Sequence, residues 1–446
     1  MGRYDGKEEY LNRLKEQIRC KKAKNMVAEE IGQHIEDQKA SYINEGDDEN
    51  TAMVKSLEQM GDPIEIGILL DKIHKPRMEW RVLLVVLILC SFGVFAQISI
   101  GNEVNIGMIS FSNDVGRHIL FLALGLLLMT SVYFFDYTKI GKYSKIIWLL
   151  LIIGIFLYAS FGIRVNGRLP HFHAYVMLFF PVYGGVIYAY KGKGYPGIIK
   201  CILFSVATVV VELQFRIQSS IIWGFLLSSI IMLTAAAMKN WFYTSKKITM
   251  AIICGWIPVF LTAIILLSDG LTTYQMDRIN YIAEVIIHPY EKGFQMSNVR
   301  QTISNAKLFG GTTDFMGFLH GVDSNYILTY VIGKWGIVAG TLVVGLFVVF
   351  ICRILYISYH QKNSLGMFVG LGSSMVFAIQ GVNYILSNLG IHIIEQVSLP
   401  FISYGGSLLA VNFIVLGIIL SVFRNTNIVE EVPYKEMLPI NIKKVS

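Results

Sequence analysis

Charged residues are scarce in this 446-residue chain, in which Asp, Glu, Lys and Arg together make up 15% of the positions. Typical soluble domains carry about 25% charged residues. Hydrophobic residues reach 54% of the chain, and its mean hydropathy is +0.54. A chain of this composition cannot cover its surface with polar groups, so a soluble globular protein is excluded and an all-α membrane protein with many spans is predicted.

Cysteine is also rare, and no two cysteines form a C-x-x-C pair. The five lie in the N-terminal segment or inside apolar runs: Cys20, Cys90, Cys201, Cys254 and Cys352. His288, His320 and His392 are too widely spaced along the chain to suggest a common metal ion. The sequence therefore predicts neither a disulfide framework nor a zinc site.

The net charge of +7 does not predict a nucleic-acid partner. The lysines and arginines occur in short clusters between apolar stretches, where the rules of membrane topology account for them. We therefore expect no nucleic-acid binding.

Residues 1–76 differ from the rest of the chain, because about half of the 31 acidic residues fall there. Apolar residues recur among them at helical spacing: Leu11, Leu14, Ile18, Met26, Ile31 and Ile35. Gly46 ends this pattern, Asp48 or Asn50 can cap a further helix, and Asp62-Pro63 can start another. The segment resembles the helical HAAS-like, or permease-prefix, domains that precede membrane regions in Gram-positive bacteria. A solvated helical appendage without a ligand is the alternative.

Beyond residue 76, ten apolar stretches are long enough to cross a bilayer. They are 81–100, 118–136, 146–163, 173–190, 197–213, 217–238, 248–268, 325–352, 364–387 and 399–423. We therefore predict a ten-helix membrane domain over residues 77–425 and a tail over 426–446.

The basic residues fall in alternate connections between these stretches. They are Lys139, Lys142, Lys145, Lys191, Lys193, Lys239, Lys246, Lys247, Arg353, Lys362 and Arg424. The positive-inside rule places that side in the cytoplasm, together with both termini. The long loop 269–324 is then extracytoplasmic.

The only long polar interruption of the membrane region runs from Asp277 to Gly336, and its order of residues is informative. The informative residues are, in order, Asp277-Arg278, Pro289, Gly293-Phe294-Gln295 and Leu308-Phe309-Gly310. The block 399–407 follows later in the chain. That block reads Leu-Pro-Phe-Ile-Ser-Tyr-Gly-Gly-Ser and enters the final apolar stretch. Residues 81–425 resemble the SEDS family, which includes FtsW, RodA and SpoVE.

The resemblance implies a peptidoglycan glycosyltransferase in the bacterial cytoplasmic membrane, with ten membrane helices and both termini in the cytoplasm. It implies lipid II as the substrate, cell shape, division or sporulation as the process, and a class B penicillin-binding protein as the partner. It also marks Gln295 and the residues Ser403, Tyr404, Gly405, Gly406 and Ser407 as candidate substrate contacts.

The chemistry of this transfer needs a base and a counter-charge. A carboxylate can take the proton of the attacking sugar hydroxyl, and cations can neutralise the departing diphosphate. Guanidinium groups bind phosphate oxygens in a bidentate fork. The arginines on the predicted outer side are Arg164, Arg168, Arg216, Arg278 and Arg300. A divalent cation, Mg²⁺ or Mn²⁺, is a further candidate for this role, although no resident metal ligands are identified.

The family keeps its carboxylate at the outer start of the eighth helix, where this chain has Asn325, with Asp323 two residues earlier. An amide cannot act as a base at neutral pH. Either Asp323 supplies the base from a shifted position, or the protein is weakly active or inactive. Asp323 could also be the N-cap of that helix. In an extended segment the two side chains would share a groove, whereas in a regular helix they would point apart.

Other blocks depart further from the family pattern. The chain has His171-Phe172-His173 in place of one family block, and Gln214-Phe215-Arg216 in place of another. Glu212 with Arg216, and Glu395 with His392, could be structural ion pairs near helix ends. Two functions remain open: a lipid II polymerase, favoured by Asp323 and the 399–407 block, and a non-catalytic scaffold, regulator or carrier of lipid-linked precursors, favoured by Asn325.

Overall fold

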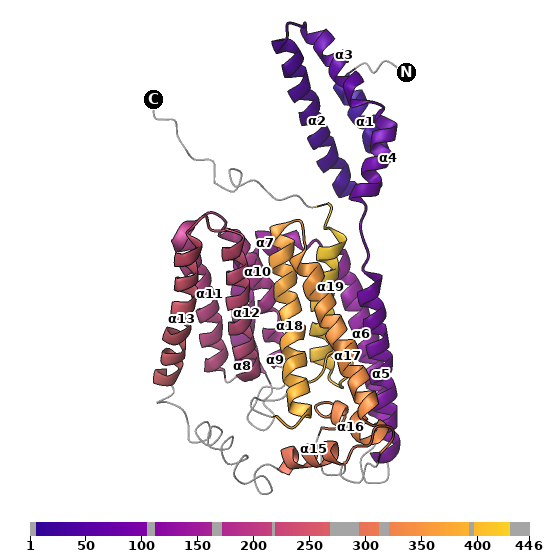
Figure 1. The fold of residues 1–446 in the computed structure, drawn as a ribbon, viewed down its shortest axis with the longest axis vertical. Coiled ribbons are helices and arrows are strands. Elements are labelled where there is room, and N and C mark those ends of the chain that lie inside the picture. The colour runs from indigo at the N-terminus through magenta and orange to yellow at the C-terminus, as the bar shows by residue number, and fades with distance from the viewer. Residues whose placement is uncertain are drawn as a thin grey trace. The chain divides into compact units, whose positions relative to one another are not determined.

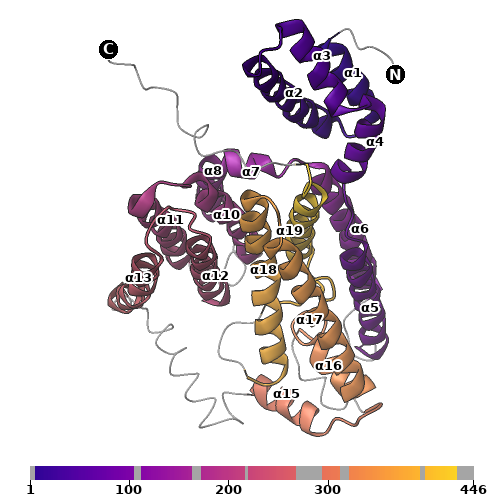
Figure 2. The same cartoon turned by 45° about the horizontal axis from the view of Figure 1, so that its top comes forward.

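The computed structural model describes residues 6–104, 112–162, 172–215, 219–267, 294–311, 321–391 and 397–428. These residues form helices and turns, with no strand among them. The chain divides into two compact units (Figures 1 and 2). The helical unit comprises Met1–Met78 with Phe423–Glu431, and the membrane unit comprises Glu79–Val422 with Val432–Ser446.

Four helices form the helical unit: α1 (Lys7–Gln17), α2 (Lys21–Asn44), α3 (Glu49–Met60) and α4 (Pro63–His74). The caps predicted from the sequence are confirmed. Asp48 accepts a hydrogen bond from the Thr51 N–H at 3.1 Å, and Asp62 accepts one from the Ile64 N–H at 2.9 Å. Pro63 occupies the first position of α4, where its missing N–H is not needed.

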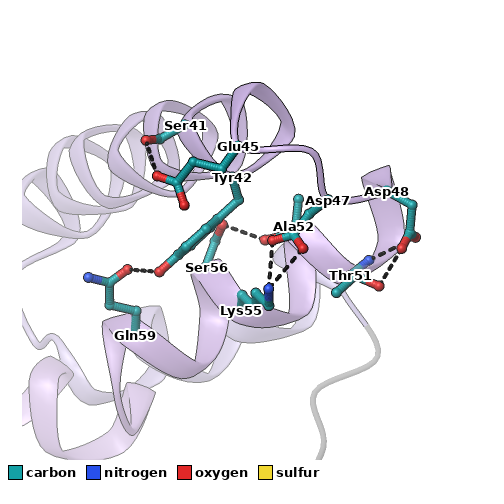
Figure 3. Close-up of polar contacts among 10 residues, drawn as sticks. All are labelled: Ser41, Tyr42, Glu45, Asp47, Asp48, Thr51, Ala52, Lys55, Ser56 and Gln59. Carbon is teal, nitrogen blue, oxygen red and sulfur yellow. Dashed lines mark hydrogen bonds and ion pairs between the residues drawn. The ribbon is translucent and has the colours of Figure 1, made fainter.

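The connection between α2 and α3 is held by polar contacts on its exposed side (Figure 3). The Lys55 ammonium bonds both carboxylate oxygens of Asp47, at 2.7 and 2.8 Å. The Tyr42 hydroxyl donates to the side chain of Gln59 across the two helices. Exposed contacts of this kind add little stability, and they leave the opposite faces of α2 and α3 free for the core.

The core of the helical unit includes a segment from the far end of the chain. Ile428 is 2% exposed and packs in one cluster with Tyr10, Leu14, Ile18, Ala23, Val27, Ile35 and Leu57. Next to it, the Asn427 amide donates to the Ile73 carbonyl at 3.1 Å, and the Asn427 carbonyl lies 2.7 Å from His74 Nδ1. Residues 423–428, named the strap here, therefore complete this unit, although the sequence predicted a separate tail from residue 426.

The membrane unit is a bundle of apolar helices. Within the described residues, eight helices are long and apolar enough to span a bilayer: α5 (Trp80–Val104), α6 (Ser112–Phe134), α8 (Ser144–Phe161), α11 (Gly194–Gln214), α12 (Ser219–Met238), α17 (Ile337–Tyr359), α18 (Ser364–Asn388) and α19 (Gly406–Arg424). α13 (Lys246–Leu267) contains Pro258. The short helices are α7 (Thr138–Lys142), α9 (Phe172–Val176), α10 (Phe179–Ala189), α15 (Phe294–Ser304) and α16 (Ile327–Trp335). The chain is an all-α polytopic membrane protein.

Three predicted spans are divided or shorter than expected. The stretch 173–190 is split into α9 and α10, and 325–352 is split into α16 and α17. Gly336, with φ of 96°, separates the latter two helices, because such a conformation interrupts the helical hydrogen-bond ladder. The stretch 399–423 is helical only from Gly406, and residues before it form turns.

α18 lies at the centre of the bundle in both views, and more of its length is buried than of any other of the eight long helices (Figures 1 and 2). Its apolar contacts include an aromatic cluster in which Phe401 stacks on Phe377 at 5.6 Å and meets Phe350 and Phe413 edge to face. Phe401 has φ of 68°, a costly conformation for a bulky residue. Burial of its ring in this cluster offsets that cost and fixes the turns before α19.

Candidate functional site

A tight turn precedes α16 and carries both candidate residues, Asp323 and Asn325. The Gly321 carbonyl accepts hydrogen bonds from the N–H groups of Asn325 at 2.7 Å and Tyr326 at 3.1 Å. The helix begins only at Ile327, and its N-cap residue Tyr326 makes no side-chain cap. The prediction that Asp323 caps this helix is therefore wrong, because the carboxylate lies one turn before the first helical residue.

The block before α19 packs against this turn. The Ser403 hydroxyl donates to the Ser324 carbonyl at 2.6 Å and accepts from the Leu399 N–H at 3.0 Å. The Tyr404 N–H donates to the Asp323 carbonyl at 3.1 Å. Two sequence blocks about 80 residues apart, each picked out by its resemblance to the family, thus form one site.

Two amide side chains from other helices also hold the turn. Gln97, from α5, donates to the Asp323 carbonyl at 2.6 Å. Asn388, from the end of α18, donates to the Asn325 carbonyl at 2.9 Å and accepts from the Thr329 N–H at 3.0 Å. Sequence reasoning missed both, since a single amide inside an apolar helix gives no signal of its own. With its carbonyl groups occupied, the turn is rigid.

The side chains of the two candidates differ in their contacts. The Asp323 carboxylate lies 3.4 Å from the Ser324 hydroxyl, which donates to it, and its residue is half-buried. The Asn325 amide oxygen accepts a hydrogen bond from the Ser398 hydroxyl at 3.3 Å. Asn325 therefore serves to join the turn to the block before α19, whereas Asp323 supplies the carboxylate of the site.

The remaining residues of the 399–407 block lie at the edge of the candidate site. Tyr404 lies beside His118 and Phe121 of α6, with ring centroids 6.2 and 6.4 Å away. Gly406 starts α19 at a point where a side chain would meet the Phe121 ring at 2.8 Å. Gly405 and Ser407, on either side of it, are half-buried.

Most of the predicted cationic residues cannot be placed. Arg164, Arg168, Arg216 and Arg278 lie outside the described residues, as do His392 and Glu395, and the side chain of Gln295 is likewise not described. Arg300 is described: its Nε donates to the Gly390 carbonyl at 3.0 Å, tying α15 to the end of α18. Its visible role is therefore structural.

Among the described residues of the membrane unit, two buried ionisable side chains have no hydrogen-bond partner. They are His118, next to Tyr404, and Glu212, near the end of α11. An interaction of Glu212 with Arg216 lies outside the described residues. The sequence singled out Glu212 as a possible ion-pair partner, whereas His118 was not identified.

The described residues contain no group of three or more His, Cys, Asp and Glu side chains that could hold a metal ion. Asp323 provides a single carboxylate at the site. A divalent cation near it would take its other ligands from substrate phosphates and water, as Mg²⁺ does where a protein supplies few carboxylates.

Comparison with known proteins places this fold and site in context. The sequence profile of the FtsW/RodA/SpoVE family, described as cell cycle proteins, matches residues 190–428. A probable peptidoglycan glycosyltransferase FtsW of Nitrosomonas europaea is 21% identical over 52% of this chain and 59% of its own length. The peptidoglycan glycosyltransferase RodA of Treponema pallidum is 27% identical over 42% of this chain and 45% of its own length. The chain thus spans about half the length of these relatives.

A longer match extends over most of the membrane unit. A probable peptidoglycan glycosyltransferase FtsW of Bacillus subtilis is 22% identical over 82% of this chain and 96% of its own length. Among solved structures, a chain from a study titled "Structural coordination of polymerization and crosslinking by a peptidoglycan synthase complex" aligns with a TM-score of 0.62. It covers 78% of this chain and 98% of its own, at 17% identity.

The rod shape determining protein RodA of Thermus thermophilus aligns with a TM-score of 0.51 and 15% identity, over 78% of this chain and 97% of its own. Both structural matches show the same fold. The family profile covers more than half of the chain and includes the turn with Asp323 and the block before α19. The chain is a member of the FtsW/RodA/SpoVE family, also called SEDS proteins.

Proposed function

We propose that this protein is a peptidoglycan glycosyltransferase that polymerises lipid II at the outer face of the bacterial cytoplasmic membrane. The observation that carries the proposal is the Asp323 turn, whose backbone is held by Gln97 of α5 and by Ser403 and Tyr404 of the block before α19. Rigid support of this kind is what a catalytic group requires, since a misplaced base loses much of its effect. Relatives named as peptidoglycan glycosyltransferases support it.

In the proposed reaction, the 4-hydroxyl of one lipid-linked disaccharide attacks the anomeric carbon of another. A new carbon–oxygen bond forms, the bond from that carbon to the diphosphate breaks, and undecaprenyl diphosphate leaves. Asp323 takes the hydroxyl proton as the new bond forms. Arg164, Arg168, Arg216 and Arg278 are the proposed partners of the diphosphate, together with Gln295 and the polar residues of the 403–407 block. A divalent cation held by the diphosphate oxygens and water would add counter-charge for the leaving group and leave Asp323 free to act as the base.

The helical unit supports the proposed topology. Since residues 1–78 and the strap fold together, the chain between them crosses the membrane an even number of times. The basic connections support a cytoplasmic location for this unit and an outer location for the Asp323 turn. We further propose a class B penicillin-binding protein as the partner, in line with the synthase complex named for one structural match. The HAAS-like helical unit is proposed to act in regulation.

A non-catalytic role, as a scaffold, regulator or carrier of lipid-linked precursors, is the second candidate function. Asn325 favours it, because the family position holds an amide that is hydrogen-bonded to Ser398 and cannot serve as a base. The choice between the two functions therefore depends on whether Asp323 replaces the missing carboxylate.

The test is polymerisation of lipid II by the purified chain in liposomes, alone and with candidate penicillin-binding partners. Asp323→Ala is expected to lower the rate by about 10²- to 10⁴-fold, the usual contribution of a general base. Asn325→Ala is the matched control, and its expected loss is smaller because it removes only a hydrogen bond to Ser398. Asn325→Asp should retain or raise activity.

Correct insertion of each variant is checked by its elution as a single species in detergent. If Asp323→Ala polymerises lipid II like the parent, the base lies elsewhere in the site. If neither the parent nor Asn325→Asp is active with any partner, the non-catalytic function is supported and the enzymatic proposal fails.

A further inference from the structure

Residues 307–310, named the arm here, form a short segment bound to the junction between α16 and α17. The Ile337 N–H donates to the Lys307 carbonyl at 2.9 Å, and the Val338 N–H donates to the Leu308 carbonyl at 3.2 Å. In return, the Gly310 N–H donates to the Trp335 carbonyl at 3.1 Å. The arm is thus fixed to the start of α17 through its backbone.

These contacts satisfy donors that a membrane helix would otherwise leave unpaired. The first N–H groups of any helix have no partner within it, and Gly336 provides no side-chain cap for α17. In hydrocarbon each unpaired group costs several kcal/mol. Since the arm caps a helix that is long and apolar enough to span a bilayer, it lies at the level where α17 enters the apolar phase.

The arm nevertheless exposes two large apolar side chains. Leu308 is 66% exposed and Phe309 is 75% exposed, while Lys307 beside them is also exposed. Placing both apolar side chains in water would forgo the free energy that their burial provides. The hydrogen bonds fix the backbone of the arm, so the points from which both side chains project are set by the junction between α16 and α17.

The exposed surface of the arm adjoins the surface that faces lipid on two helices. Ile337 and Leu342 are exposed on α17, and Phe95 is exposed on α5. The Trp335 ring stacks on Phe95, with centroids 5.1 Å apart, and so joins α5 to the junction that holds the arm. Aromatic rings at this level are typical of the boundary between membrane and water.

We propose that the arm is an interfacial anchor, in which Leu308 and Phe309 insert into the apolar edge of the bilayer while the Lys307 ammonium contacts lipid phosphates. Leucine and phenylalanine next to lysine are a combination that suits this boundary, where apolar side chains reach inward and ammonium groups reach the headgroups. The partner surface is the lipid bilayer itself, and the inference does not depend on the proposed reaction.

The position of the anchor has a consequence for the candidate site. α16 runs from the Asp323 turn to Trp335, and the arm is bonded to its last residue. Insertion of the arm therefore sets the height of Asp323 relative to the headgroup layer. A carboxylate that acts beside a lipid diphosphate needs such a fixed height.

The test uses the full chain in vesicles of phosphatidylethanolamine and phosphatidylglycerol. The photoreactive residue p-benzoylphenylalanine replaces Phe309, whose ring it resembles, and lipid adducts are measured by mass spectrometry after illumination. The control carries the same residue in place of Gln301, an exposed polar position on α15. A several-fold higher yield of lipid adducts at position 309 is expected.

A second measurement avoids the bulky label. Phe309→Trp adds one indole, and its extra fluorescence relative to the parent should be quenched by brominated lipids and protected from aqueous iodide. Equal adduct yields at the two positions, or quenching by iodide instead of by brominated lipid, would overturn the proposal. Illumination in cells that yields mainly protein adducts at position 309 would also overturn it and indicate a protein partner.

Discussion

The strap gives a sharp test of the two-unit fold. We expect Ile428→Ala to destabilise the helical unit, although the residue lies about 350 positions after the helices it contacts. Ile428 is 2% exposed and packs against Tyr10, Leu14 and Leu57 among others. No other helix of the unit covers the space that its side chain fills, so truncation leaves a cavity.

The expected size of the effect follows from the burial. Replacing a fully buried isoleucine with alanine removes the transfer free energy of about three carbons, at roughly 0.8 kcal/mol each, and adds a cavity term. Measured losses for such changes are about 2–5 kcal/mol. A unit of this size has a total stability of about 4–13 kcal/mol, at roughly 0.05–0.15 kcal/mol per residue. The change therefore removes a large part of it.

Hydrogen exchange of the backbone amides in α1–α4, measured by mass spectrometry on the full chain in detergent, reports this loss. A loss of 2 kcal/mol corresponds to about 30-fold faster exchange of the most protected amides, since 1.4 kcal/mol is a factor of 10. Ile43→Ala is the matched control, because Ile43 belongs to α2 of the same unit and is 43% exposed. Its exchange should stay close to that of the parent.

Equal protection of α1–α4 in the parent and in Ile428→Ala would refute the assignment of the strap to this unit. Faster exchange in Ile43→Ala as well would show that the unit is unstable to any truncation. In that case the buried contact of Ile428 would not be the cause.

Two further changes have definite outcomes. Gly336→Ala should lower the thermal unfolding temperature of the membrane unit, because φ of 96° and a contact of 2.5 Å to the Leu308 carbonyl oppose a side chain at this position. Gly345→Ala, in open space within α17, should leave that temperature unchanged. Equal unfolding temperatures of the two variants in detergent would contradict the prediction. The hydrogen bonds from the Thr51 hydroxyl and N–H hold the pKa of Asp48 below its usual value, so their contribution to stability is present above about pH 4 and is lost as the pH falls through the folded pKa. Asp48→Asn keeps a capping side chain that does not titrate. The α3 amides of this variant should therefore lose less protection from hydrogen exchange between pH 5 and 3 than those of the parent. Identical losses would contradict the role of the Asp48 carboxylate in this pH dependence.

Much of the membrane fold could be predicted from composition and charge. Every predicted span contains a helix, because a bilayer requires long apolar helices and long runs of apolar residues are easily recognised in a sequence. The break at Gly336 could not be predicted, since membrane helices often contain glycine without interruption. This glycine differs from others because the backbone of the arm is hydrogen-bonded to the start of α17, directly after it.

The candidate site was predicted in part. The family resemblance identified Asp323 and Ser403, which the structure brings together through the Ser324 carbonyl. It could not identify Gln97 or Asn388, because a polar residue in an apolar helix acquires its role only from the helix packed beside it. The strap was missed for a related reason: contacts between residues 10 and 428 leave no local pattern in the sequence.

The strap also sets an order in time. The first 78 residues leave the ribosome before the membrane unit, and at about 5–20 residues per second the strap follows roughly 20–70 seconds later, once α19 has been made. Until then the core of the helical unit lacks Ile428, so its apolar interior stays open. A closed helical unit thus marks a chain whose synthesis has passed α19, and proteases that act on exposed cores can distinguish such chains from ones truncated before the strap.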